Sequence, residues 1–139
     1  MKYLYPIFFA LVSLLTQEIS AQLDTCVTEI DKFSGRKVFI YGNVMPQFPG
    51  GQDSLLAFIV KNLTWPEDDG ANYMGTIIVA FIIESDGTLT NKNIIKGIYP
   101  KADTAVLKLI DKMPKWIPGK CKDKQVPFKT YVPLRFKLN

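Results

Sequence analysis

The sequence contains no histidine and only two cysteines, and these absences exclude most catalytic and metal-binding arrangements. Without histidine the chain cannot form a Ser–His or Cys–His pair, and Cys26 and Cys121 are too far apart to suggest a CxxC pair of metal ligands. A GxSxG motif and a glycine-rich phosphate loop between a strand and a helix are also missing. We therefore predict that the protein is not an enzyme and binds no metal or cofactor.

The sequence also lacks a block of like charge. Its 17 Lys and Arg residues outnumber its 13 Asp and Glu residues, for a net charge of +4, but they are spread along the chain. Nucleic-acid-binding domains usually concentrate positive charge on one face or in one run. We expect neither nucleic acid nor a small-molecule substrate as partner, and homo-oligomerisation stays open.

The N-terminus carries the one long apolar run of the chain. Lys2 gives a basic start, residues 3–15 are apolar, and Ala21 supplies a small residue at a plausible cleavage point. This pattern predicts a signal peptide over residues 1–21, with the mature protein beginning at Gln22 in the periplasm. An uncleaved inner-membrane anchor is the alternative, although the run is shorter than the ~20 residues that span a bilayer.

Export leaves three states open for the cysteines. Cys26 and Cys121 either form a disulfide, which would tie the N-terminal lead to the loop after WIPGK, or remain free thiols, because sequence separation says nothing about distance in space. Lipidation of Cys26 is the third. Thr25 disfavours it, since the residue before a lipidated cysteine is normally tiny.

One domain is expected after a short polar lead. Residues 22–36 are polar and mixed without periodicity, and residues 37–139 carry the ordered patterns. The first pattern is KVFIYGNV, which is rich in β-branched and aromatic residues and predicts a strand over residues 37–44. The prolines Pro46 and Pro49 end it.

A helix follows the FPGG motif. Gly50 and Gly51 form its entrance, and Asp53 lies in the first turn, where the helix dipole favours negative charge. The apolar residues recur at helical spacing. They are Leu55, Leu56, Ile59, Val60 and Leu63.

The stretch GTIIVAFIIESDGTL predicts a strand and a turn. Its apolar residues occupy both faces, which is typical of a strand in the middle of a sheet, and SDG is a turn signal. The chain should return as a second strand over residues 89–98.

A second helix should end at the segment MPKWIPGK. Its apolar stripe runs from Ala102 to Met113, and Pro114 stops it. We expect Trp116 to fold back onto the stripe, and Pro118 with Gly119 to start a turn. The segment would then clamp the helix to the sheet.

The final run, residues 126–138, alternates between apolar and polar side chains as a strand does. Pro133 has no N–H for a ladder bond, which places this strand at an edge of the sheet. An edge strand is either protected by charge and proline or used to dock a partner's strand. Both interpretations fit the sequence.

Several motifs resemble the TonB C-terminal domain in the form common among Bacteroidetes-type proteins. In order, they are MPQFPGG and the helix after it, GTIIVAFIIESDGTL, ADTAVLKLIDKMPKWIPGK and VPFKTYVPLRFKL. The resemblance covers about residues 38–139. It implies an α+β fold with two helices packed on one face of a small antiparallel sheet, which agrees with the order of elements above.

The resemblance also implies a partner. In that family the domain binds the TonB box of an outer-membrane receptor, which adds a strand along the domain's last strand. Here the docking strand would be residues 126–138. The side chains flanking it would be Lys129, Tyr131, Pro133, Arg135 and Lys137. The implied function is a periplasmic protein-interaction module in TonB-dependent outer-membrane transport.

The chain departs from the full-length family pattern. An energy transducer carries an inner-membrane helix and a long proline-rich spacer before this domain, whereas residues 22–36 would reach at most ~50 Å at ~3.4 Å per residue. The alternative is a stand-alone structural or assembly module of the envelope. If residues 37–44 pair with the last strand, they would close the docking edge, and the sequence does not decide this.

Overall fold

The computed structural model describes residues 25–66 and 74–137. The proposed signal peptide and the predicted start at Gln22 lie outside the described residues. The elements, in chain order, are β1 (Val27–Ile30), β2 (Lys37–Tyr41), α2 (Gln52–Asn62), β3 (Gly75–Ile83), β4 (Leu89–Lys96), α3 (Pro100–Asp111), β5 (Lys120–Cys121), β6 (Lys124–Gln125) and β7 (Phe128–Phe136). Within the described part of the chain, no helix has the length and hydrophobicity needed to cross a membrane.

The fold is α+β, as predicted, and it is built on one main sheet. Five strands lie in the order β1-β2-β7-β3-β4, and β5 with β6 forms a separate hairpin. β3 runs antiparallel to both of its neighbours, β4 and β7, but β2 runs parallel to β7. The sheet is therefore mixed. A parallel pair needs a long crossover between its strands, and the chain between β2 and β7 provides one that includes α2, β3, β4 and α3.

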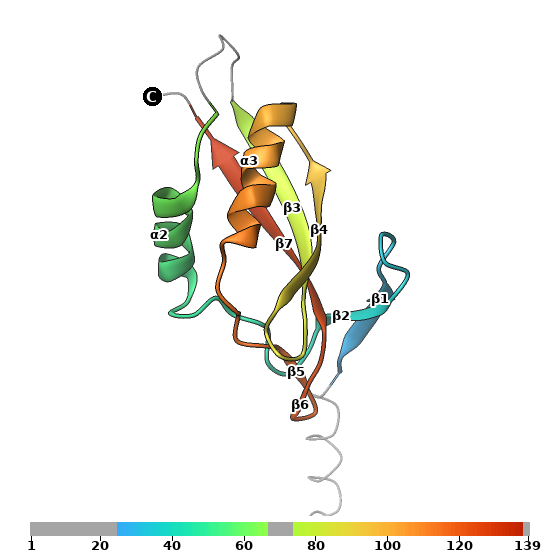
Figure 1. The fold of residues 1–139 in the computed structure, drawn as a ribbon. Helices are drawn as coiled ribbons and strands as arrows, with labels where there is room; N and C mark the ends of the chain where they lie inside the picture. The colour runs from blue at the N-terminus through green and yellow to red at the C-terminus, as the bar shows by residue number, and fades with distance from the viewer. Residues whose placement is uncertain (1–24, 67–73, 138–139) are drawn as a thin grey trace, which may run out of the picture.

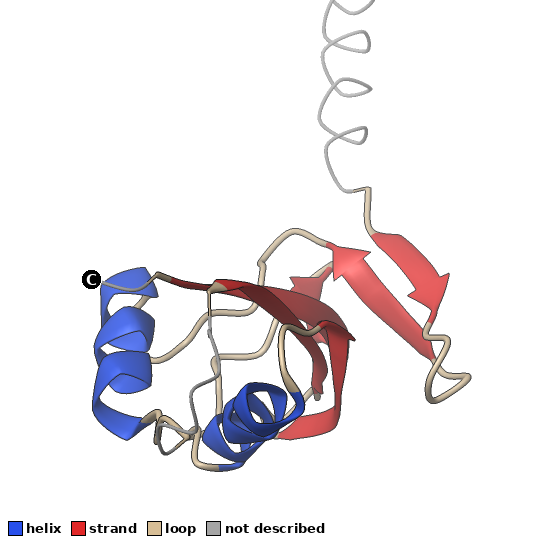
Figure 2. Ribbon diagram, turned by 90° about the horizontal axis from the view of Figure 1, so that it is seen from above, coloured by secondary structure: helices blue, strands red, loops and turns tan. Residues whose placement is uncertain are grey.

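Both helices contribute apolar residues to the same core. α3 lies across β3 and β4, and α2 lies beside β7 (Figure 1). Viewed from above, the β1–β2 hairpin extends away from the helices (Figure 2). The core between helices and sheet is formed by Phe48, Leu55, Ile77, Val79, Phe81, Ile83, Ala102, Val106, Leu109, Ile110, Trp116, Val132 and Leu134.

β3 is the central strand that its sequence predicts. Ile77, Val79 and Phe81 belong to the core on the helix side. On the other face Ala80 and Ile82 are also buried. From Ile78 to Ile83 the strand has both edges paired and all side chains but Ile78 buried, so this part of β3 supports the sheet.

The segment 113–120 clamps three parts of the fold together. α3 ends at Asp111, before Pro114, and the ring of Trp116 then packs edge-on against Phe48 and Phe81, with centroid distances of 5.6 and 5.5 Å. The backbone N–H of Trp116 donates to the backbone carbonyl of Gly87 in the β3–β4 turn, at 2.9 Å. Pro114 thus keeps the helix from continuing, and the chain after it carries the tryptophan to the sheet.

The same segment also forms two bridges to the chain before α2. Ile117 exchanges backbone hydrogen bonds with Gln47, at 2.8 and 3.0 Å, and Lys120 does so with Val44, at 2.8 and 3.2 Å. Pro118, between the two bridges, is half-buried, and Gly119 is buried. A side chain at Gly119 would meet the ring of Phe128 at 2.4 Å, so only glycine fits there.

The FPGG motif forms the entrance of α2. Gly50 and Gly51 have φ values of 84° and 86°, which glycine adopts without the steric cost that other residues meet. A Cβ on Gly50 would also lie 2.3 Å from the hydroxyl of Ser54. Asp53 lies in the first turn of the helix, as predicted.

The sequence prediction missed β1, which lies in the supposed polar lead. Val27–Ile30 pairs antiparallel with β2 to form a hairpin. The structure joins Cys26, just before β1, to Cys121 in β5 by a disulfide with a Cα–Cα distance of 6.1 Å. The hairpin is thus fastened covalently to the rest of the domain.

Candidate functional site

β7 is paired along its whole length on one side and at a single residue on the other. All nine of its residues pair with β3. On the opposite side β2 pairs at a single position, Phe39 with Phe128. The prediction that the last strand is an edge is therefore wrong at Phe128, and beyond this residue no other described strand covers the outer edge of β7.

The backbone groups that β7 turns outward can be identified from one hydrogen bond. The N–H of Phe39 in β2 donates to the carbonyl of Pro127, at 2.9 Å, so the groups of residue 127 point toward the outer edge. Backbone groups alternate in direction along a strand. Tyr131, Pro133 and Arg135 therefore turn theirs outward as well.

This alternation explains the position of Pro133. The missing N–H of a proline at this position falls on the outer edge, so the ladder to β3 loses no hydrogen bond. The edge offers the N–H groups of Tyr131 and Arg135 and the carbonyls of all three outward residues. A strand added here would have two donors, separated by the proline.

A groove runs along this edge between β7 and α2. Its volume is about 700 Å³. We call it the docking groove; its lining residues are Pro46, Gln52, Leu55, Leu56, Ile59, Val60, Leu63, Trp116, Thr130, Tyr131, Val132, Pro133, Leu134, Arg135 and Phe136. Most of these side chains are apolar, and Arg135 alone among them carries a charge.

The α2 wall of the groove has exposed apolar side chains. Leu55 is buried in the core, whereas Leu56 is 61% exposed and Val60 is 76% exposed. The sequence predicted all of these as one helix stripe and assigned none of them to a site. The sequence did contain a signal for this apolar wall. Leu56 and Val60 are four residues apart, so they are neighbours on one side of that stripe.

The predicted partner-binding side chains divide into two groups. Tyr131 is 48% exposed, and Pro133, Arg135 and Lys137 are exposed too, with Lys137 just beyond the end of β7. Lys129 is only 7% exposed, so it does not present a free charge to a partner. The assignment of Lys129 to the docking surface is therefore corrected.

Lys129 instead forms a buried ion pair with the β1–β2 loop. Its Nζ lies 2.7 Å from a carboxylate oxygen of Asp31 and 3.5 Å from one of Glu29. Burial opposes the ionisation of Asp31, but hydrogen bonds from Lys129 and Ser34 outweigh it and lower the pKa of Asp31 to about 2. Burial likewise opposes the charge of Lys129, and the bond to Asp31 raises the pKa of this lysine overall.

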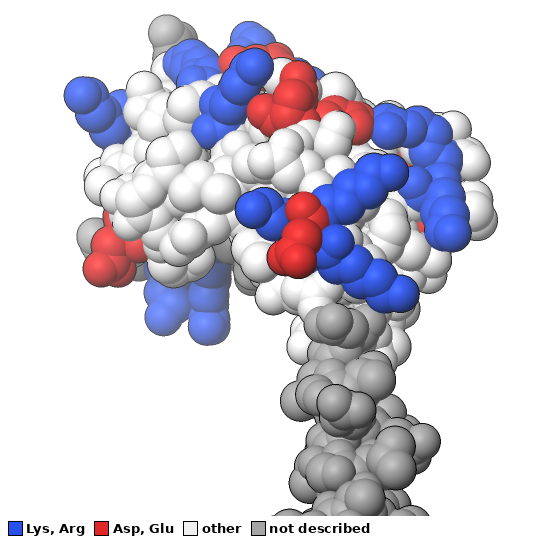
Figure 3. Space-filling model, turned by 90° about the horizontal axis from the view of Figure 1, so that it is seen from below, with Lys and Arg blue, Asp and Glu red and all other residues white. Residues whose placement is uncertain are grey.

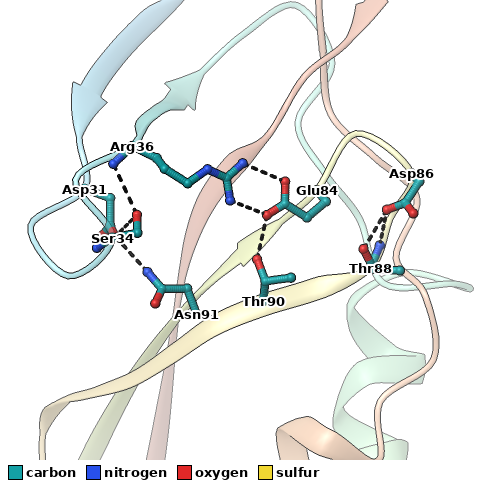
Figure 4. Close-up of polar contacts among 8 residues, drawn as sticks. All are labelled: Asp31, Ser34, Arg36, Glu84, Asp86, Thr88, Thr90 and Asn91. Carbon is teal, nitrogen blue, oxygen red and sulfur yellow. Dashed lines mark hydrogen bonds and ion pairs between the residues drawn. The ribbon is translucent and has the colours of Figure 1, made fainter.

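Further polar contacts hold the same loop over the β3–β4 end of the sheet (Figure 4). Asp31 accepts from the backbone and hydroxyl of Ser34, at 2.8 and 2.6 Å, and from the amide of Asn91 in β4, at 2.8 Å. Arg36 donates two hydrogen bonds to Glu84, at 2.6 and 3.0 Å, which lower the pKa of Glu84. Thr90 donates to the same carboxylate.

These contacts fix how much of the edge is covered. The disulfide holds one end of the hairpin, and the Asp31 and Arg36 contacts hold its loop. β2 thus stays at Phe128 and does not extend along β7. The sequence left open whether residues 37–44 close the edge, and the structure leaves the edge open from residue 130 to residue 136.

Metal-binding side chains are not clustered in the described residues. No group of three or more His, Cys, Asp or Glu side chains there could hold a metal ion.

A second hollow, of about 680 Å³, lies between the C-terminal end of α2 and helix α3. Its lining includes Trp65, two lysines of α3 and Lys112 at the C-cap of α3. Seen from below, this face of the molecule carries both positive and negative side chains (Figure 3).

Comparison with known protein families gives a match. The family model described as Gram-negative bacterial TonB protein C-terminal matches residues 65–138, which is more than half of the chain. The matched segment contains β3, β4, α3, β5, β6 and β7, whereas β1, β2 and α2 precede it. No curated protein and no solved structure matches the chain.

Proposed function

Because the chain belongs to the Gram-negative bacterial TonB protein C-terminal family, we propose that it docks an extended segment of an outer-membrane receptor by strand addition to β7. The family consists of protein-interaction domains of the cell envelope, and not of enzymes. The finer role that we propose is an exported, periplasmic module of TonB-dependent transport, with a receptor's TonB box as the docked segment. The predicted signal peptide of residues 1–21 supports export.

One observation carries the proposal, namely the unpaired outer edge of β7 beside an apolar groove. Strand addition uses exposed backbone groups for affinity and pockets for alternate side chains for specificity. The outer edge supplies the backbone groups of Tyr131, Pro133 and Arg135, and the groove supplies Leu56 and Val60. An isolated edge of this kind is otherwise a hazard for aggregation, and the proline and charges along it reduce that hazard.

The fixed hairpin defines the length of the docking site. β2 occupies the edge at Phe128, so an added strand has residues 130–136 available. Its side chains would alternate between the groove and the opposite face of the sheet. On that opposite face Arg135 is exposed, and a carboxylate of the segment would find a cation there.

Amide chemical-shift mapping with a synthetic TonB-box peptide tests the proposal. We expect shifts concentrated at residues 130–136 and on α2. Shifts confined to α3, or none at millimolar peptide, would contradict it.

Two substitutions at one position separate the backbone from the side chain. Tyr131→Pro removes the outward N–H without removing a hydrogen bond to β3, and Tyr131→Ala removes only the side chain. If docking uses the backbone, the proline variant should bind about tenfold more weakly than the alanine variant, since a lost hydrogen bond and a steric clash add. Circular dichroism serves as the control that both variants keep the fold. Equal affinities would mean that Tyr131 contributes no backbone hydrogen bond.

A further inference from the structure

The indole N–H of Trp116 is a buried donor without an acceptor. Trp116 is 6% exposed, and its Nε1 has no hydrogen-bond partner within the described part of the chain. Its ring is fixed by edge-on contacts with Phe48 and Phe81, so it cannot turn toward another acceptor without losing both. Buried donors are nearly always paired, and an unpaired one in a native structure calls for a ligand, a water or a functional reason.

This donor belongs to a residue that lines the docking groove. Trp116 shares the lining with Pro46, Gln52 and Thr130, whereas the other end of the groove is lined by Leu63 and Phe136. The indole N–H can only donate, and the hydroxyl of Thr130 can both donate and accept. One end of an otherwise apolar groove thus has capacity for hydrogen bonding to a side chain.

We propose that Trp116 is a specificity-determining residue of the docking groove, and that its indole N–H binds a neutral acceptor, a carboxamide, on the docked segment. This inference rests on the proposed docking function. A carboxamide matches the site because its oxygen accepts from the indole and its NH₂ donates to the Thr130 hydroxyl. A carboxylate matches less well at this end of the groove, because the charged residue of the lining, Arg135, lies five residues along β7 from Thr130 and on the opposite face of the strand. Burying a charge here without a partner is costly.

The position of the acceptor on the segment follows from strand geometry. Every second side chain of an added strand faces the groove. The segment should therefore carry apolar side chains at its groove-facing positions and a carboxamide at the one nearest Thr130. Since Nε1 is covered in the free chain, the rim of the groove must move aside when the segment docks; Gln52 is exposed there.

The test uses the 139-residue chain and a set of synthetic ten-residue peptides. Each peptide has leucine at its groove-facing positions, and in each a glutamine replaces one of these leucines in turn; the all-leucine peptide is the matched control. The chain has two tryptophans, so Trp65→Phe identifies the indole signal of Trp116. We expect one glutamine peptide to bind about three- to tenfold more tightly than the control and to move the Trp116 indole proton downfield.

Trp116→Phe then removes the donor and keeps an aromatic ring in the core. In this variant the preference for the glutamine peptide should disappear, while the unfolding midpoint of the free protein should stay or rise. If the variant does not fold, the affinities of the peptide series for the unaltered chain, together with its Trp116 indole signal, still test whether the indole binds the carboxamide.

The outcomes separate this inference from the proposed function. Shifts at residues 130–136 with every peptide, equal affinities and an unmoved indole proton would overturn the role of Trp116 and leave docking intact. A preference for glutamine that persists in Trp116→Phe would also overturn it. The absence of shifts on β7 with all peptides would overturn docking, and this inference with it.

Discussion

The two helices have similar lengths but opposite relations to the sheet. α3 buries Ala102, Val106, Leu109 and Ile110 against it. α2 buries only Leu55 and leaves Leu56 and Val60 exposed beside the open edge of β7. The difference separates a helix that stabilises the fold from a helix that forms one wall of a binding groove.

The same contrast holds between β3 and β7. β3 has a strand on each side and both faces covered, whereas β7 has its outer edge free from residue 130 to residue 136. Substitutions on the packed side, around α3 and β3, should therefore change stability. Substitutions on the open side, along α2 and the outer edge of β7, should change binding. The predictions below test this division, beginning with the largest effect.

Trp116→Ala should lower the free energy of unfolding by ~3 to 5 kcal/mol, because it truncates an aromatic side chain packed between Phe48 and Phe81. Chemical denaturation measures the loss. Trp65→Ala is the matched control, since Trp65 is 38% exposed and should lose clearly less. A Trp116→Ala variant with an unchanged midpoint would show that the ring does not hold the core together and acts only in the groove.

Replacing Cys26 and Cys121 together by serine should cost about 2 to 4 kcal/mol, because the disulfide links residues 95 apart in sequence. Denaturation with and without reductant measures this for the unaltered chain, and the double variant should match the reduced protein. The amide signals of β1 and β2 should change more than those of α3. Uniform changes across the domain would mean that the hairpin is not a separately fastened unit.

Acid should weaken the contact between the hairpin loop and β7. The pKa of Asp31 in the folded protein is about 2, lower than in the unfolded chain, so its stabilisation is complete above pH ~4 and is lost as the pH falls toward 2. The loss should be of order 2 kcal/mol. Denaturation at pH 2, 3, 4 and 6 measures it.

Asp31→Asn is the matched variant, because it keeps the shape of the side chain and removes its charge. It should be less stable at neutral pH and should show a smaller change between pH 4 and pH 2. An equal acid effect in both proteins would assign the loss to other carboxylates.

Leu56→Ser and Val60→Ser should change stability by less than about 0.5 kcal/mol, because both side chains are already exposed. Their affinity for a docked TonB-box peptide should fall several-fold, as apolar contact area is lost. Ala57→Ser is the control on the same helix, since Ala57 is exposed but does not line the groove. Equal effects of the three variants on affinity would remove α2 from the groove.

The regular elements could be predicted because their apolar residues repeat with clear periods. The stripe of α3, the two-sided β3 and the alternation of β7 each follow from local pattern. The edge position predicted from Pro133 is wrong for the strand order, because β7 lies between β2 and β3, although β2 pairs with it only at Phe128. β1 could not be predicted, since its pairing with β2 and its disulfide depend on partners distant in sequence. Four residues of mixed polarity do not identify a strand by themselves.

The site was predictable only in part for the same reason. Alternation placed Tyr131, Pro133 and Arg135 on one face, and it placed Lys129 there as well. Alternation cannot show that Asp31, nearly one hundred residues earlier, covers Lys129. Nor can it show that β2 stops at Phe128 and leaves the edge open, because strand order in a sheet is a property of the whole fold.

Amide hydrogen exchange along β7 tests the central claim, the open outer edge, most directly. In the free protein we predict alternation, with fast exchange at Tyr131 and Arg135 and slow exchange at Thr130, Val132 and Leu134, whose N–H groups face β3. A docked TonB-box peptide should slow Tyr131 and Arg135 and leave the other three unchanged. Equal protection of all five amides in the free protein would show that the edge is already paired, and would contradict the account.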